Sequence, residues 1–364
     1  MSVQLVTVAV LLLAILPPAF PYSCVTPVKD YCVVENVTQP YTGAKFPPNE
    51  RAVWIRNSTL PTVDRELFEA LGAVENLMIH RLQIERLVLV GCDSLDVLFA
   101  ANNAISSVEA TEGLPLRQLH LYQNRLTDVS GLRVLSAIEQ LYLHDNLLET
   151  LRLDVFAPLD RLKILTLQRN RLRSITTHPS VPTRTLSLPR LEQLFLQFNQ
   201  LPVLDTSLWR MERLRVLDLS HNQLGYLLTF LEELPSLRTV ELHHNPWNCG
   251  WLFGMLERLA EREMDSFTTE DEATCTGILL EEQVCCSENA TAPDPVLLLV
   301  SRTGIVDELQ HQVRGARKQI DALEEAQRKH THQLREFAKK FEQLEQLCSR
   351  TSAQGKADKE TNDG

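Results

Sequence analysis

A short pattern of leucines and asparagine recurs through the middle of this 364-residue chain and restricts its fold more than any other feature. The consensus is L-x-x-L-x-L-x-x-N-x-L, and successive repeat asparagines are 21 to 29 residues apart. A repeat of this length indicates a stack of similar structural units. The clear copies are LRQLHLYQNRL (116–126), IEQLYLHDNLL (138–148), LKILTLQRNRL (162–172), LEQLFLQFNQL (191–201) and LRVLDLSHNQL (214–224); LDVLFAANNAI (95–105) and LRTVELHHNPW (237–247) are weaker.

This pattern is the leucine-rich repeat, and its internal spacing explains the expected fold. The x-L-x-L-x piece alternates, so it predicts a short strand whose leucines share one face. One strand cannot bury its leucines alone, whereas stacked units bury them in a continuous core. Two degenerate units around residues 53–55 and 77–79 bring the count to about nine, over residues 49–248. We therefore predict an α/β leucine-rich-repeat solenoid, a horseshoe with its parallel strands on the concave side.

The outward positions of these strands are the expected binding surface, because the leucines and asparagines are structural. They are rich in aromatic residues and histidine, and exposed aromatic residues mark contact surfaces better than charges do. The alternative is a merely solvated face. No carboxylate or cysteine set at ligand spacing accompanies the histidines, so neither a metal nor another cofactor is expected. The candidate ligand-binding residues are His120, Tyr122, Tyr142, His144, Phe195, Phe198, His221 and His243.

The N-terminus predicts a secreted protein. Residues 3–16 form an apolar run that two prolines end, as in a signal peptide, and we expect residues 1–23 to be removed. The alternative, an uncleaved anchor, would need a longer apolar run to span a bilayer, and no later segment is long enough either. Secretion permits disulfides. Three glycosylation sequons, at Asn36, Asn57 and Asn289, fit the same compartment.

Cysteines flank the repeats and predict a cap at each end. Residues 24–48 form the expected N-terminal cap, closed by a disulfide between Cys24 and Cys32. Residues 249–295 begin with NPWNC (245–249), which resembles the C-terminal cap of extracellular leucine-rich-repeat proteins, usually N-P-W-x-C-x-C. Trp251 stands where the second cysteine is usual. We expect Cys249 to pair with Cys275; pairing of Cys249 with Cys285 or Cys286 is the alternative, since connectivity does not follow from sequence.

Residues 296–349 predict an α-helical coiled coil, followed by a disordered polar tail over residues 350–364. A heptad runs unbroken over about 60 Å of helix. Its apolar seam requires a second helix, from an identical or a different chain, while Gln327 and His330 make a polar step that fixes register or partner. The a positions are Val306, Val313, Ile320, Gln327, Leu334, Phe341 and Cys348, and the d positions are Leu309, Ala316, Leu323, His330, Phe337 and Leu344.

The adjacent pair Cys285 and Cys286 stands between the expected cap and the coil. Neighbouring cysteines rarely bond to each other, because disulfide geometry strains the peptide between them. The coil would bring two chains together at this hinge. We therefore expect Cys285, Cys286 and Cys348 to be candidates for interchain disulfides. The alternative is that the pair completes the local cap and Cys348 is a free thiol.

The order of signal sequence, leucine-rich repeats, cysteine cluster and coiled coil resembles the mosquito leucine-rich-repeat immune proteins. The specific feature is QVCC (283–286), which follows NPWNC (245–249) and precedes the heptads. The modest repeat number and short coil are similar to the short, secreted, coiled-coil members. The resemblance implies a haemolymph protein of innate immunity. Longer members form disulfide-linked complexes that hold a complement-like thioester protein and act against parasites.

The function favoured by the sequence is therefore recognition or scaffolding. The concave face would bind a protein or a pathogen surface, while the coil and hinge cysteines assemble a complex. No nucleophile elbow, zinc-protease motif or phosphate-binding loop is present, so an enzyme is not expected. The net charge of −11 argues against nucleic acid as a partner. The alternatives are an extracellular matrix or adhesion protein, or a decoy for a leucine-rich-repeat receptor.

Overall fold

The computed structural model describes the repeats and parts of both flanking regions. The chain divides into two compact units, Met1–Gly304 and Ile305–Gly364. Residues 1–21 of the predicted signal peptide, the sequon at Asn289 and the cysteine at Cys348 lie outside the described residues. The structure describes residues 22–25, 27–39, 46–47, 49–177, 185–228, 230–262, 264, 275–280, 284–288, 317, 319–320, 323, 325, 327–331 and 339.

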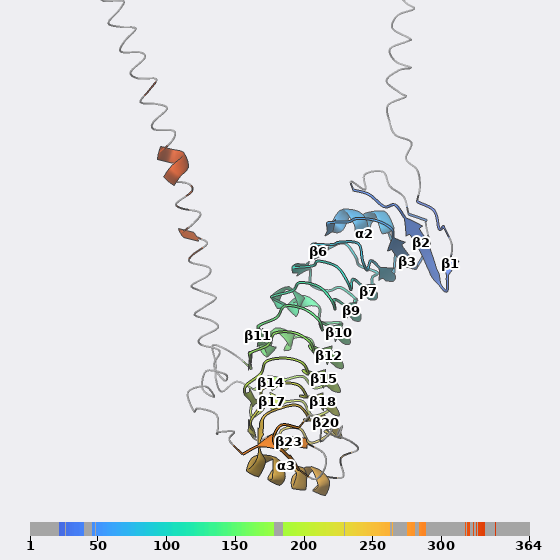
Figure 1. The fold of residues 1–364 in the computed structure, drawn as a ribbon. Coiled ribbons are helices and arrows are strands. Elements are labelled where there is room, and N and C mark those ends of the chain that lie inside the picture. The colour runs from blue at the N-terminus through green and yellow to red at the C-terminus, as the bar shows by residue number, and fades with distance from the viewer. Residues whose placement is uncertain are drawn as a thin grey trace, which may run out of the picture. The chain divides into compact units, whose positions relative to one another are not determined.

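One long sheet runs through the first unit (Figure 1). Its first two strands pair antiparallel, and every later neighbour pairs parallel, as successive coils of a solenoid require. The predicted leucine-rich-repeat solenoid is confirmed. In spatial order the strands are β1 (Pro27–Val28), β2 (Tyr31–Glu35), β3 (Ala52–Arg56), β5 (Asn76–Met78), β7 (Val97–Phe99), β9 (Gln118–His120), β10 (Gln140–Tyr142), β12 (Ile164–Thr166), β15 (Gln193–Phe195), β18 (Val216–Asp218) and β20 (Thr239–Glu241).

The alternation of the repeat explains the core. The middle residue of each short strand is buried, and most of these residues are leucines such as Leu119, Leu141 and Leu217, each with 0 % exposure. Its neighbours on either side point the other way, because successive side chains of a strand alternate between faces. Each buried leucine contributes about 1.5–3 kcal/mol before conformational entropy is counted. The strand register therefore separates a continuous leucine core from an exposed sheet face.

Short elements close the opposite side of the coils, across the core from the long sheet (Figure 1). One of them, α2 (Arg65–Leu71), begins at Asp64, whose side chain accepts a hydrogen bond from the Glu66 amide. Cys92 lies in this unit as a buried free thiol, and burial raises its pKa to about 11. The short elements are β4 (Thr62–Val63), β6 (Arg86–Leu89), β8 (Ser107–Ala110), η1 (Ser130–Val134), β11 (Thr150–Arg152), η2 (Leu153–Phe156), β13 (Ser174–Thr176), β14 (Leu186–Ser187), β16 (Leu204–Asp205), β17 (Trp209–Arg210) and β19 (Leu227–Leu228).

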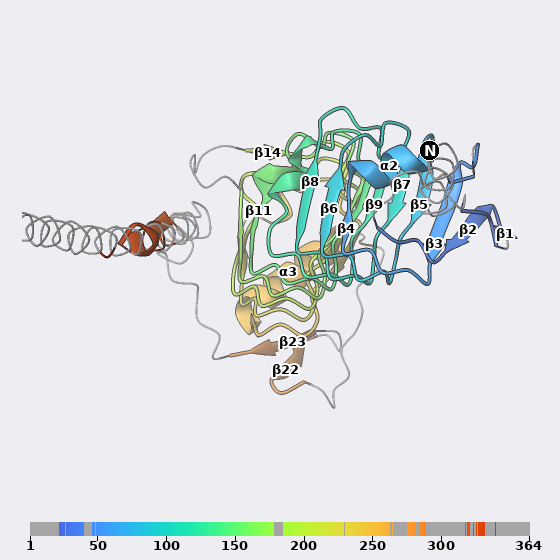
Figure 2. The ribbon, with the colours of Figure 1, turned by 90° about the horizontal axis from the view of Figure 1, so that it is seen from above.

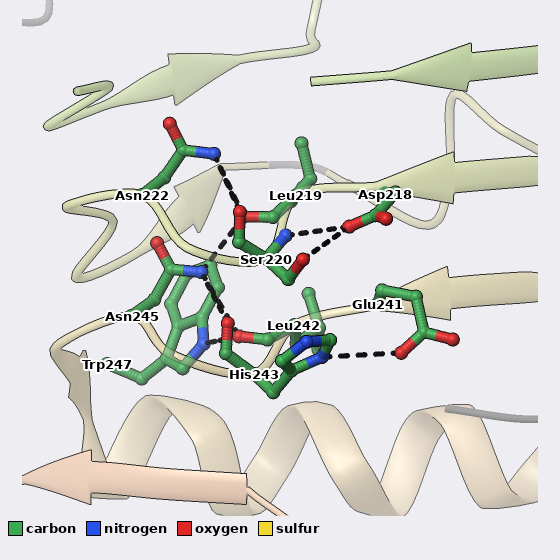
Figure 3. A network of polar contacts seen from close by, with 9 residues as sticks. All are labelled: Asp218, Leu219, Ser220, Asn222, Glu241, Leu242, His243, Asn245 and Trp247. Atoms are coloured by element: carbon green, nitrogen blue, oxygen red, sulfur yellow. Dashed lines mark hydrogen bonds and ion pairs between the residues drawn. The ribbon is translucent and has the colours of Figure 1, made fainter. Parts of the chain in front are cut away.

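The repeat asparagines join each coil to the preceding one. Asn146 Nδ2 donates to the Leu121 and Leu143 carbonyls at 3.0 Å each, and its Oδ1 accepts from the Leu126 amide at 3.0 Å. Asn222 and Asn245 repeat the arrangement toward the C-terminus (Figure 3). The Leu121 and Leu143 carbonyls each accept a further hydrogen bond, from Asn124 and Asn170. These bonds matter because a buried backbone group left unpaired is costly. The asparagine is therefore fixed by hydrogen bonding across coils.

The C-terminal cap consists of α3 (Cys249–Glu261) and a three-stranded sheet beside it (Figures 1 and 2). The strands are β21 (Trp247–Asn248), β22 (Ile278–Leu280) and β23 (Val284–Ser287). The Asn248 side chain accepts from the Trp251 amide and so caps α3. Trp251 stacks on Trp247 at 4.9 Å between ring centroids and donates its indole N–H to the Leu227 carbonyl. A tryptophan thus packs where the related caps carry a cysteine.

The cysteine pairing of this cap differs from the expected one. Cys249 bonds to Cys286, and Cys275 bonds to Cys285, so the pairing of Cys249 with Cys275 is wrong. The expected interchain role of Cys285 and Cys286 is also wrong, because both are occupied within the chain. The reason is that Cys285 and Cys286 are consecutive residues of β23, where neighbouring side chains point to opposite faces. Cys286 is buried toward α3, while Cys285 is directed to the other side.

The N-terminal cap continues the sheet instead of covering it. β2 pairs parallel with β3, and β1 folds back on β2 as an antiparallel edge. A disulfide links Cys24 and Cys32, the pair expected from the sequence. Tyr22 packs on Phe46 at 4.8 Å between ring centroids. One short disulfide loop is therefore enough to secure this end.

The described residues of the second unit are helical, over 317, 319–320, 323, 325, 327–331 and 339. Ile320 and Leu323, predicted a and d positions, are 49 % and 69 % exposed in this single chain. Most of residues 296–349 and all of residues 350–364 lie outside the described part, so the coiled coil stays a prediction. Among the described residues, no helix combines the length and the apolar character of a membrane span.

Candidate functional site

The exposed side of the long sheet is the candidate binding surface, called here the concave face. The strand register aligns three columns of side chains on it. The first column is Phe99, His120, Tyr142, Thr166, Phe195, Asp218 and Glu241; the second, two residues later, is Ala101, Tyr122, His144, Gln168, Gln197, Ser220 and His243; the third is Asn102, Gln123, Asp145, Arg169, Phe198, His221 and His244.

Stacked rings occupy the N-terminal half of this face. His120 lies between Phe99 and Tyr142, with ring centroids 4.1 and 4.3 Å apart and interplanar angles of 20° and 9°. Beside them Tyr122 stacks on His144 at 4.5 Å and 6°. Parallel strands lie about 4.8 Å apart, which places rings at matching positions face to face. We call these five residues the aromatic ladder.

The imidazoles of the aromatic ladder are held neutral. Burial lowers the pKa of His120 to about 4, and the nearby His144 adds to the effect. The pKa of His144 is also lowered, first by burial, while Asp145 acts in the opposite direction. His144 Nδ1 lies 3.0 Å from Thr166 Oγ1, a hydrogen-bond distance. At neutral pH the aromatic ladder therefore presents ring edges with little charge.

In the middle of the same face, three polar atoms have no hydrogen-bond partner among the described residues. They are His120 Nε2, Gln168 Oε1 and Gln197 Oε1, and all three are buried. An unsatisfied buried polar atom costs about 1–3 kcal/mol, so native proteins usually pair such atoms or use them. A ligand or an ordered water that met these atoms would recover that cost. The three atoms therefore mark the middle of the face as a place for polar contacts.

Toward the C-terminus the first two columns carry carboxylates and an imidazole in place of the stacked aromatic ladder (Figure 3). Asp218 and Glu241 occupy paired positions on β18 and β20. Asp218 Oδ1 accepts hydrogen bonds from the Ser220 amide and hydroxyl, at 3.0 and 2.7 Å. Burial raises the Asp218 pKa, and those hydrogen bonds oppose the rise. Glu241 Oε2 lies 3.4 Å from His243 Nδ1, an ion-pair distance when the imidazole is protonated.

The third column adds a second stack. Arg169 lies over the Phe198 ring at 4.8 Å, Phe198 stacks on His221 at 4.0 Å, and His221 stacks on His244 at 4.1 Å. Every residue of this column has a left-handed backbone, with φ between 52° and 56°. Because all the coils share this conformation, it is a feature of the repeat turn. This conformation directs the third-column side chains of successive coils along one edge of the sheet, where they stack. The sequence pattern alone does not reveal that stacking.

Seven of the eight predicted site residues thus divide between two clusters. His120, Tyr122, Tyr142 and His144 belong to the aromatic ladder. Phe198, His221 and His243 lie in a second group of ring contacts toward the C-terminal end of the face, called here the C-terminal cluster. Phe195 is half-buried on β15, in register between Thr166 and Asp218. The two described sequon asparagines, Asn36 and Asn57, are exposed and lie in the N-terminal part of the fold.

Comparisons with known proteins agree with the fold. A family model described as Leucine rich repeat matches residues 189–246. The chain therefore has the leucine-rich-repeat solenoid fold. No curated protein sequence matches it significantly.

Solved structures that resemble this leucine-rich-repeat protein include domains of mosquito immune proteins. The APL1 leucine-rich repeat domain is 23 % identical, with a TM-score of 0.51, and the match covers 70 % of each chain. The APL1B domain is 22 % identical, with a TM-score of 0.49, over 71 % of this chain and 85 % of its own. The LRIM1/APL1C complex is 20 % identical, with a TM-score of 0.38, over 85 % and 79 %. At 23 % identity and a TM-score of 0.51, the likeness to the APL1 domain shows a common fold and nothing beyond it.

Proposed function

We infer that this chain is a secreted innate-immune recognition and scaffold protein. Its concave face binds a protein or microbial-surface ligand, and its C-terminal helix joins a second coiled-coil chain, identical or different. A complement-like thioester protein is the further partner that the resemblance to the mosquito proteins implies. The observation that carries this inference is the aromatic ladder, an ordered row of half-buried rings on the concave face.

The aromatic ladder suits recognition for a physical reason. Aromatic side chains give large contact areas with few rotatable bonds, so ordering them on binding costs little entropy. Here the stacking holds the rings in place before any partner arrives. Binding to a preorganised surface avoids part of the ordering cost. The unpaired atoms of His120, Gln168 and Gln197 add hydrogen-bonding capacity beside the rings.

Assembly is expected from the second unit. A helix that leaves Ile320 and Leu323 exposed at heptad spacing has an apolar seam without cover in the single chain. Because Cys285 and Cys286 are occupied in the cap, Cys348 is left as the candidate for an interchain disulfide. Three intrachain disulfides favour an oxidising, extracellular location.

Binding is tested with the full-length secreted chain on two probes, heat-killed bacteria and purified thioester protein. Tyr122→Ala combined with Tyr142→Ala should weaken binding at least about tenfold on whichever probe the wild type binds, because central aromatic anchors dominate interfaces. Phe253→Ala is the matched control, since Phe253 is an aromatic residue 49 % exposed on α3, outside the concave face. Equal binding by all three proteins would contradict a role for the concave face.

Assembly is tested by native size fractionation in extracellular fluid. The wild type should run above the mass of one chain, and Ile320→Lys with Leu323→Lys should run as a single chain. Glu325→Lys is the control, because position 325 lies on the outer side of the predicted heptad. A wild type that runs as one chain would remove the coil from the proposal.

A further inference from the structure

Three histidines from two successive coils meet in the C-terminal cluster of the concave face. His221 comes from the turn after β18, and His243 and His244 come from the turn after β20. One ring nitrogen from each lies within 4.8 Å of the others. Three of the 10 histidines in the chain therefore converge at one place. Such convergence across coils depends on the stacking of the solenoid.

The arrangement of the rings suits a shared ion. His221 and His244 are stacked at 4.1 Å and 23°, so their edges run side by side. His243 stands edge-on to both, 5.3 Å away at 84° and 82°. Zinc–nitrogen bonds of about 2.0–2.1 Å in a tetrahedral site place ligand nitrogens roughly 3.3 Å apart. Side-chain rotations of the order of an ångström would close the present separations to that value.

Glu241 provides the outer contact that metal-binding histidines usually have. Its Oε2 lies 3.4 Å from His243 Nδ1, and that nitrogen is buried without a hydrogen bond. A histidine that ligates a metal through one ring nitrogen commonly donates the other N–H to a carboxylate. The contact therefore leaves His243 Nε2 for the ion. A slight closure of the 3.4 Å separation would turn this contact into a hydrogen bond.

The charges around the cluster are compatible with a cation. Asp218 interacts electrostatically with His243 and Glu241, so two carboxylates stand beside the imidazoles. Arg169 is the opposing charge, and the Phe198 ring lies between it and His221. A second grouping of ligand atoms, Cys24 and Cys32 with Glu50, carries no such site because both sulfurs form a disulfide.

We propose that His221, His243 and His244 bind one zinc-type divalent transition-metal ion, with Glu241 positioning His243. Imidazole ligands suit zinc and its neighbours in the first transition row. Three protein ligands leave the fourth position of a tetrahedral ion open. Because His244 is exposed, that position faces solvent, where a carboxylate or imidazole of a docked partner can complete it. The ion would then act as a contact point of the concave face, and its uptake does not depend on the proposed immune role.

The test is calorimetric titration of Zn²⁺ into the isolated full-length chain, without an affinity tag and stripped of metal by a chelator. We expect one ion per wild-type chain. Glu241→Gln keeps all three imidazoles and should weaken affinity about 10- to 100-fold, the usual effect of losing an outer-shell partner. His221→Gln with His243→Gln should weaken it further. His144→Gln, on the same face, and His330→Gln with His332→Gln, in the predicted coil, should bind like the wild type.

Co²⁺ absorption provides a second readout of the same site. Wild type should show the visible bands of four-coordinate cobalt, and the double variant should lose them while unfolding at an unchanged urea concentration. The proposal is overturned if the wild type takes up no stoichiometric ion. It is equally overturned if the variant His330→Gln with His332→Gln, rather than the variants at positions 221, 241 and 243, removes the binding.

Discussion

The two ends of the solenoid are closed by different means. At the N-terminus β2 and β1 prolong the sheet, and a disulfide between residues only 8 apart fixes them. At the C-terminus α3 covers the last coil with an apolar face, and a separate sheet carries two disulfides: Cys249–Cys286 ties β23 to α3, and Cys275–Cys285 ties the segment before β22 to β23. One of these spans 37 residues. An end that continues hydrogen bonding needs little extra chain, whereas an end that exposes a leucine core needs a cover tied down over a distance.

The largest expected effect comes from the long disulfide. Cys249→Ser with Cys286→Ser should lower the free energy of unfolding by about 4 kcal/mol, because the loop it closes is long. The double change avoids a stray thiol. The measurement is the urea midpoint of the secreted chain. A loss below about 1 kcal/mol would mean that α3 and β23 hold the cap without this bond.

The N-terminal disulfide should matter less. Cys24→Ser with Cys32→Ser removes a short loop, so we expect a loss of about 2–3 kcal/mol in the same assay. Comparing the two double variants isolates the loop length, since each leaves the other cap intact. A larger loss at the N-terminus than at the C-terminus would reverse the comparison between the two ends.

A glycine next to β22 should be the most sensitive non-cysteine position of the C-terminal cap. A Cβ at Gly277 would overlap the carbonyl oxygen of Cys286, so Gly277→Ala must push β22 from β23. We expect a loss of about 2 kcal/mol in thermal unfolding. Gly254→Ala is the matched control, because a Cβ there meets nothing within 4 Å and α3 should gain about 0.5–1 kcal/mol. Equal effects at both glycines would refute the close approach.

Trp251 should give the smallest effect. Trp251→Phe keeps a ring against Trp247 but removes the indole hydrogen bond to the Leu227 carbonyl. We expect a loss of about 1 kcal/mol, the usual value of one hydrogen bond. Tyr226→Phe, also near this ring, serves as a comparison for aromatic substitution in the cap. A neutral result for Trp251→Phe would mean that packing alone explains the tryptophan.

The repeats could be predicted from sequence because their signal is local. Leu119, Leu141 and Asn146 each lie at a fixed spacing within one coil, and the spacing alone determines which face they occupy. The columns of the concave face follow from the same alternation, which also places His120 beside Tyr142.

The cap and the histidine cluster depend on long-range contacts that periodicity does not contain. The four residues of β23 are too few to show a strand pattern, so the opposite directions of Cys285 and Cys286 were not foreseen. Alternation along β23, once recognised, explains why adjacent cysteines serve two separate bonds. His221 meets His243 and His244 only because the left-handed turns of successive coils align.

The central claim is that QVCC closes the solenoid and leaves assembly to the coil. Its most direct test is a disulfide map of the secreted full-length chain by non-reducing mass spectrometry, with fragmentation between Cys285 and Cys286. The structure predicts Cys249 bonded to Cys286 and Cys275 bonded to Cys285, all within one chain. A bond between Cys249 and Cys275, or a bond from Cys285 or Cys286 to another chain, would contradict it.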